Sequence, residues 1–177
     1  MQTQDTLRPL DIAVALGLAA WTDSTAPTYL ALGQRLGLSA STVHQSVQRL
    51  QAAGLLHPDS RTPNRLALRE FLTHGVRYCF PPALGAEVLG VPTAHSGPGL
   101  AALFDASDAI VWPDSSGTVR GTSLTPLYPG ATALPERAPE VYRMLSLVDG
   151  IRVGRARERS AAIAALGEVI SSCPELG

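Results

Sequence analysis

The chain has 177 residues, of which 45% are hydrophobic and 16% are charged, and its formal net charge is −1. This composition supports a buried core and argues against wholesale disorder. The longest apolar run, residues 12–21, is about half of the ~20 residues that span a bilayer, and no basic stretch followed by an apolar segment opens the chain. We therefore expect no membrane anchor, no secretion signal and a cytoplasmic location.

The charges are unevenly distributed. Residues 1–80 hold seven arginines and five acids, a balance of +2, whereas residues 81–150 hold three arginines and seven acids, a balance of −4. All 14 basic residues are arginine. Any cation that contacts a phosphate or a base is therefore a guanidinium.

Three helices are predicted in the first part of the chain. Residues 7–21 form the first, and residues 28–36 form a short second helix that Gly37 ends. Ser39 is placed to cap a third helix, residues 40–53, which Gly54 closes.

A hairpin and a fourth helix are predicted next. Residues 55–57 and 65–69 read as two strands around a turn-rich tip at 58–64, so the wing covers 58–65. A helix over 70–80 then ends at the proline pair 81–82.

The remainder of the chain is rich in Pro and Gly up to residue 135, with one predicted hairpin formed by residues 109–112 and 118–124. From residue 139 the pattern is helical, and a last helix follows residues 150–154. The predicted fold is mainly α with a small β wing, a winged helix-turn-helix, plus a C-terminal extension. Its domains are 1–80 for DNA binding, 81–138 as a Pro/Gly-rich segment, and 139–177 as C-terminal helices for dimerisation.

The third helix carries the functional argument. Val43, Val47 and Leu50 make one apolar stripe at helical spacing. The opposite face and its flanks hold only hydroxyl, amide, imidazole and guanidinium groups, and no acid. These side chains are Ser41, Thr42, His44, Gln45, Gln48 and Arg49. Such groups contact base edges and phosphates in a major groove.

The segment from Leu32 to Ser39, followed by Ser41-Thr42-Val43 and by residues 50–56 (Leu-Gln-Ala-Ala-Gly-Leu-Leu), resembles the winged helix-turn-helix of MarR-type bacterial transcription regulators. The resemblance covers about residues 7–80. It implies a turn at Gly37, a recognition helix after Ser39 and a wing after the Gly-Leu-Leu ending. Gly33 departs from the alanine that is usual in the family.

The wing arginines have two interpretations. Arg61 and Arg65 bracket the tip, where a guanidinium can lie in or beside a narrow minor groove. The alternative is that both are solvated hairpin charges. We favour DNA contact for at least one of them because of the helix beside them.

A second basic feature is left open. Arg152, Arg155 and Arg159 make a basic stripe if the last helix is continuous. This stripe fits contact with a DNA backbone, or with an acidic surface of a partner or of residues 81–150, and a solvated face fits it equally well.

No catalytic or metal-binding constellation is assembled. Cys79 and Cys173 lack zinc-ligand spacing, and His57, His74 and His95 have no spacing with other ligands. The acidic residues Asp105, Asp108 and Asp114 have no partner nucleophile or base. We therefore expect no enzymatic activity, no metal and no cofactor.

The sequence thus predicts a sequence-specific regulator that binds double-stranded DNA as a homodimer. The last two helices either supply the dimer interface, which we favour, or cover the winged domain's own core. The alternative function is a winged-helix protein-interaction module, an adaptor or antitoxin-like partner. Whether an effector binds within residues 81–177 stays open.

Overall fold

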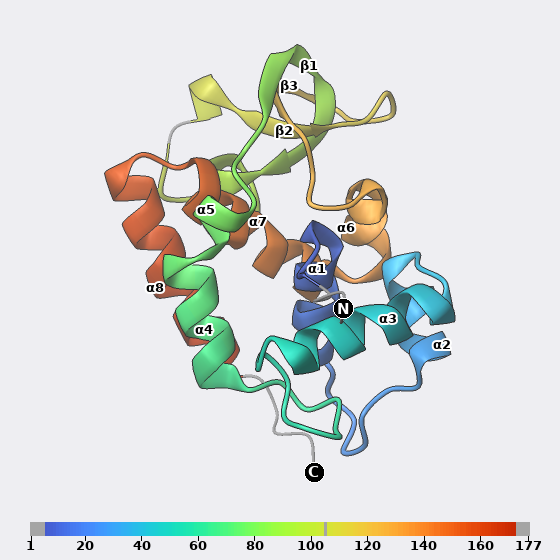
Figure 1. Cartoon of the computed structure of the whole chain (residues 1–177). Coiled ribbons are helices and arrows are strands. Elements are labelled where there is room, and N and C mark those ends of the chain that lie inside the picture. The colour runs from blue at the N-terminus through green and yellow to red at the C-terminus, as the bar shows by residue number, and fades with distance from the viewer. Residues whose placement is uncertain (1–5, 105, 173–177) are drawn as a thin grey trace.

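The computed structural model describes residues 6–104 and 106–172. Figure 1 shows helix α1 in the middle of the molecule, α2 and α3 on one side, α4 and α8 on the other, and a small sheet at the end away from the wing. The helices, apart from three short 3-10 turns, are α1 (Pro9–Ala19), α2 (Tyr29–Leu36), α3 (Ala40–Ala52), α4 (Arg65–His74), α5 (Val76–Cys79), α6 (Leu134–Arg137), α7 (Pro139–Val153) and α8 (Ala156–Ser172).

Helix α1 is buried on all sides. Every residue from Asp11 to Ala20 is buried, which fits a helix that is apolar around its whole circumference. It packs against α2, α3 and α7. One hydrophobic core therefore joins the N-terminal helices to the C-terminal ones.

The helix-turn-helix is built by local signals. The Thr28 hydroxyl accepts a hydrogen bond from Ala31 N at 3.1 Å and starts α2. Gly37 ends that helix in the left-handed region at φ 70°, where a residue without Cβ is favoured. The Ser39 hydroxyl accepts from Thr42 N at 3.1 Å and starts α3. Both helices lie where the sequence predicts them.

The wing is shorter than predicted. Its arms pair through a bridge between Leu56 and Pro63. The predicted second strand over 65–69 is wrong, because Arg65 is the first residue of α4. Asn64 caps this helix by accepting from Ala67 N at 3.2 Å, and Leu68 lies buried beneath it. The helix predicted over 70–80 therefore begins five residues earlier, and it is interrupted at residue 75 before α5.

The sheet also differs from the prediction. Its strands are β1 (Leu84–Thr93), β2 (Ile110–Pro113) and β3 (Val119–Leu124), and they close into a small barrel. Strands β2 and β3 do not form the predicted hairpin, because they pair in parallel, with Ile110 opposite Thr122. Both instead pair antiparallel with the unpredicted β1, whose Gly90 lies opposite a residue of each.

The C-terminal helices meet at Gly154. Helix α7 continues through residue 150, and every residue from Met144 to Arg152 is buried. Helix α8 packs against α7 and α4 and buries Ala162, Leu166 and Ile170.

The predicted arginine stripe at 152, 155 and 159 does not exist as a surface, because the helix breaks between its first two members. Arg152 is only 5% exposed and forms an ion pair with Asp149, Nη1 to Oδ1 2.6 Å. The other Asp149 oxygen accepts hydrogen bonds from Thr93 at 2.8 Å and from Trp112 at 2.7 Å. Arg152 is thus part of the core contact between α7 and the sheet.

Candidate nucleic-acid interface

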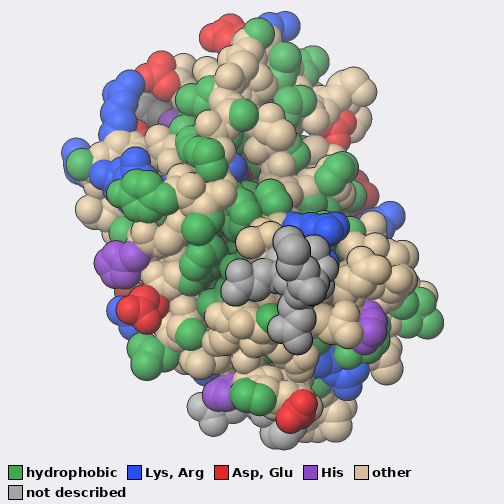
Figure 2. Space-filling model, in the orientation of Figure 1, with side chains coloured by type: hydrophobic (Ala, Val, Ile, Leu, Met, Phe, Trp, Pro, Cys, Tyr) green, Lys and Arg blue, Asp and Glu red, His purple; other side chains and the backbone are tan. Residues whose placement is uncertain are grey.

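The outer face of α3 is polar and exposed. Ser41, His44, Gln45 and Gln48 are exposed, and Thr42 is half-buried. Helix α3 contains no acidic residue. In Figure 2, the surface beside the grey atoms on this side of the molecule is mainly tan, with blue and purple side chains among it. This surface presents both donors and acceptors without the repulsion that a carboxylate would exert on phosphates.

A rigid inner face supports these groups. The side chains of Val43, Val47 and Leu50 are at most 1% exposed. They lie in the same core as buried residues of α1 and α2, which pack against α3. Because the apolar stripe fixes the rotation of α3 about its axis, the polar side chains are held toward solvent.

Arg49 does not lie on the exposed face where the sequence analysis placed it. Its side chain is 4% exposed, with Nε 2.8 Å and Nη2 2.7 Å from the two carboxylate oxygens of Asp11. Asp11 is fully buried and also accepts from Arg8 N at 2.7 Å. This bidentate pair joins α3 to the start of α1, so Arg49 is a core residue and not part of the exposed polar face.

Tyr29 links the recognition helix to the wing. The ring centroid of Tyr29 is 5.0 Å from the ring centroid of His44. The guanidinium carbon of Arg61 lies 5.1 Å from the same Tyr29 centroid. A hydrogen bond also holds the wing against α3, because Gln51 Nε2 donates to Ser60 O at 2.7 Å. The wing arginine is therefore held beside α3.

Arg65 lies at the base of the wing. It is half-buried at the first position of α4 and takes part in an interaction of its own. The structure thus separates the two wing arginines: Arg61 belongs to the loop, and Arg65 to the helix that follows it.

An arginine from the C-terminal half of the chain, which the sequence did not indicate, also lies near the helix-turn-helix. Arg137, the exposed last residue of α6, lies so close to the turn that a Cβ on Gly37 would be 2.9 Å from its Nη1. Nearby, the Tyr128 hydroxyl donates to Leu36 O at 3.0 Å. Burial raises the pKa of Tyr128, so this hydroxyl stays a donor at neutral pH. No short-range signal connects residues 100 apart, and only the fold reveals this cation.

The remaining residues considered from the sequence do not assemble a site. Within residues 6–104 and 106–172, no three His, Cys, Asp or Glu side chains form a metal-binding group. No helix of this part of the chain is long and apolar enough to cross a membrane. Cys79 is exposed and free, whereas Cys173 and Asp105 lie outside the described residues.

Comparison with known proteins adds one finding. The chain shows no significant similarity to a curated protein or to a solved structure. Residues 27–56, which run from the start of α2 to the first arm of the wing, match a family model described as winged helix-turn-helix DNA-binding. The part of the chain that presents the exposed polar helix is therefore similar to a DNA-binding domain.

Proposed function

We propose that this protein is a sequence-specific DNA-binding transcription regulator that acts as a homodimer in the cytoplasm. The observation that carries the proposal is the exposed, acid-free face of α3, held by a fully buried stripe, within the segment that matches a DNA-binding family. In this proposal residues 1–80 supply the DNA-binding surface, and residues 81–138 and 139–177 supply the pairing and regulatory surfaces.

The side chains take different roles. Gln45 and Gln48 lie near the middle of the exposed face and read base edges, since an amide can pair with both the acceptor and the donor that adenine presents in the major groove. Ser41 reads bases beside them. Thr42 and His44 lie nearer the phosphates.

The arginines supply positioning charge. Arg61, stacked on Tyr29, enters or borders the minor groove, and Arg65 contacts the backbone behind it. Arg137 extends this positive surface to the turn at Gly37. Guanidinium contacts of this kind fix orientation and give binding its salt dependence.

Selection from random-sequence duplex DNA at two salt concentrations tests the proposal. We expect enrichment of a palindromic site whose half-sites are about one helical turn apart, as two-fold pairing requires. In the Gln45→Ala/Gln48→Ala variant we expect specific affinity to fall by about tenfold or more, because one bidentate amide–base contact contributes roughly 1–3 kcal/mol. Ser115→Ala, an exposed change in the turn between β2 and β3, is the matched control and should bind like the parent.

The Arg61→Ala variant distinguishes a side chain that positions the protein on DNA from one that reads the base sequence. We expect weaker binding to all sequences, an unchanged preference and a salt slope reduced by about 1. If no sequence is enriched and only weak, steeply salt-dependent binding is seen, specific recognition is refuted. The polar face of α3 would then belong to a protein partner.

A further inference from the structure

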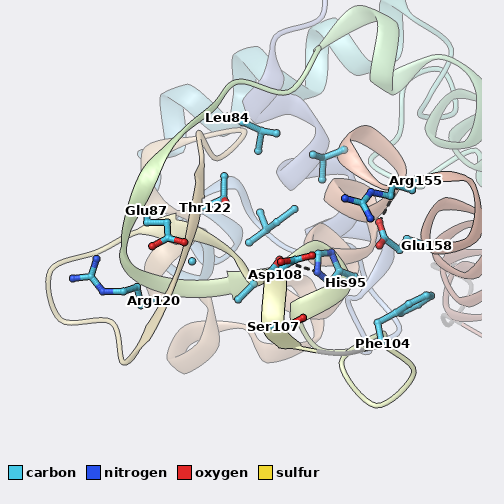
Figure 3. A pocket seen from close by; sticks show the side chains of 14 residues that line it. Leu84, Glu87, His95, Phe104, Ser107, Asp108, Arg120, Thr122, Arg155 and Glu158 are labelled. Carbon is cyan, nitrogen blue, oxygen red and sulfur yellow. Dashed lines mark hydrogen bonds between the residues drawn. The ribbon is translucent and has the colours of Figure 1, made fainter.

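A cavity of about 510 Å³ lies between the small sheet and the junction of α7 and α8 (Figure 3). Small-molecule sites typically have volumes of about 300–1,000 Å³. No residue of α2, α3 or the wing lines this cavity. The cavity is therefore distinct from the proposed DNA-binding surface, and ligand binding in the cavity can be measured in the absence of DNA.

One part of the wall is apolar. Leu84 of β1, Ile110 of β2, Val153 at the end of α7 and Phe104 contribute side chains to the lining. Leu84 is 53% exposed, so part of this apolar wall is open to solvent. An aliphatic or aromatic group of a ligand would cover these surfaces and gain free energy by leaving water.

His95 offers a hydrogen-bond acceptor. Its side chain is buried, and its Nε2 lies 3.0 Å from the backbone oxygen of Asp108. A carbonyl oxygen only accepts, so Nε2 carries the hydrogen and Nδ1 of the neutral ring is an acceptor. That Nδ1 is buried and has no partner within residues 6–104 and 106–172. Buried polar atoms are nearly always bonded to protein, water or a ligand, so Nδ1 is the acceptor on this wall that a donor would satisfy.

Charges of both signs lie next to this ring. Figure 3 shows the Arg155 side chain extending from the α7–α8 side toward the middle of the cavity, and the Asp108 side chain beside His95. The Arg155 backbone is fixed, because its N donates to Glu158 Oε2 at 2.9 Å. Within the described ranges, its guanidinium forms no ion pair. Glu87 and Arg120 stand on the opposite wall.

We propose that this cavity binds a zwitterionic amino acid with an apolar side chain. The guanidinium of Arg155 pairs with the ligand carboxylate, and the ligand ammonium donates to His95 Nδ1 and to the Asp108 carboxylate. The side chain of the amino acid covers Leu84, Ile110 and Phe104. A purely anionic ligand would face Asp108 and Glu158, and a purely cationic one would face Arg155, so a ligand with both charges fits best.

Isothermal titration calorimetry with the full chain tests this site. The probes are L-leucine and L-phenylalanine, with two analogues of the latter: L-phenylalaninamide, which lacks the carboxylate, and 3-phenylpropionate, which lacks the ammonium group. We expect at least one amino acid to bind and both analogues to bind about tenfold more weakly or worse, since each loses a charge-assisted contact.

A pair of variants locates the binding. Arg155→Gln should lower the affinity about tenfold or more, whereas Arg157→Gln, an exposed change two residues later and outside the lining, should leave it unchanged. Both positions are exposed, so both variants should fold. The proposal is overturned if neither amino acid binds at millimolar concentration, if an analogue binds as tightly as phenylalanine, or if the two variants behave alike.

Discussion

Removing the carboxylate of Asp11 is expected to destabilise the whole protein. Three hydrogen bonds end on this buried group: Arg8 N at 2.7 Å, Arg49 Nε at 2.8 Å and Arg49 Nη2 at 2.7 Å. In Asp11→Ala the guanidinium stays between α1 and α3 with its carboxylate removed. Because both side chains are at most 4% exposed, water cannot take over the lost contacts without opening the core.

The magnitude follows from two contributions. Breaking a buried ion pair by removing one partner costs about 3–5 kcal/mol. The lost acceptor for the first turn of α1 adds about 1 kcal/mol. Against a total stability of about 5–15 kcal/mol, Asp11→Ala should be close to unfolding, with a melting temperature lower by roughly 10–20 °C.

Urea denaturation followed by circular dichroism measures this loss. The double variant Asp11→Leu/Arg49→Met is the control, because replacing both charges by apolar groups should recover most of the stability. At a temperature where the double variant is folded, it should also bind DNA within about threefold of the parent. A loss below about 1 kcal/mol in Asp11→Ala, or a folded double variant with no DNA affinity, would refute the core assignment of Arg49.

Three further predictions concern the interface and the sheet. Tyr29→Ala removes the ring that positions the wing guanidinium, a contact of about 0.5–1 kcal/mol at an exposed site, so fluorescence anisotropy should show roughly two- to fivefold weaker DNA binding. A larger effect would mean that the tyrosine itself contacts DNA. Gly37→Ala and Gly54→Ala both place a Cβ in the left-handed region, at φ 70° and 73°, and should each cost about 1–2 kcal/mol in urea. Only the first would displace Arg137, so equal DNA affinities of the two variants would exclude a role for that arginine. Burial raises the pKa of Tyr142 to about 12, so the folded state holds this proton more tightly than the unfolded state does, and the stability that this group contributes should be constant below pH 10 and be lost between pH 10 and 12. Tyr142→Phe should show a shallower fall of melting temperature with pH in this window, and an identical profile would contradict the assignment.

The helix-turn-helix could be predicted because its signals are local. The cap at Ser39, the glycine at residue 37 and the stripe of Val43, Val47 and Leu50 act within one or two turns of helix. Each also agrees with the tertiary packing, which places that stripe in the core. A cap at Asn64 was equally readable, and it would have placed the start of α4 correctly instead of a second wing strand.

The position of Arg49 could not be read from α3 alone. On a helical wheel it flanks the polar face, and only the approach of α1 buries it. The available signal lay elsewhere in the chain: Asp11 is a single carboxylate in front of a long apolar run, and a buried carboxylate requires a cationic or hydrogen-bonding partner. The sequence does not say which arginine, 38 residues away, that partner is.

Strand β1 was missed for a similar reason. Glycines at 85 and 90 and a proline at 92 weaken the local strand signal. In the structure Gly90 is needed, because a Cβ there would lie 2.1 Å from Trp112 O, where β1 passes from one partner strand to the other. Gly90 thus lowers the strand propensity and also allows β1 to approach its partner strands closely.

The burial of α7 restricts how two copies can pair. The sequence favoured a dimer interface made by the last two helices, but the residues from Met144 to Arg152 are buried within one chain against α1, the sheet and α8. An interface at this end of the molecule can therefore be formed by α8 but not by residues 144–152 of α7. Helix α8 also packs against α4, which follows directly from the wing. Pairing of two copies through α8 would therefore fix the distance between their wings and between their α3 helices. The spacing of the selected half-sites would then report the geometry of α8 pairing.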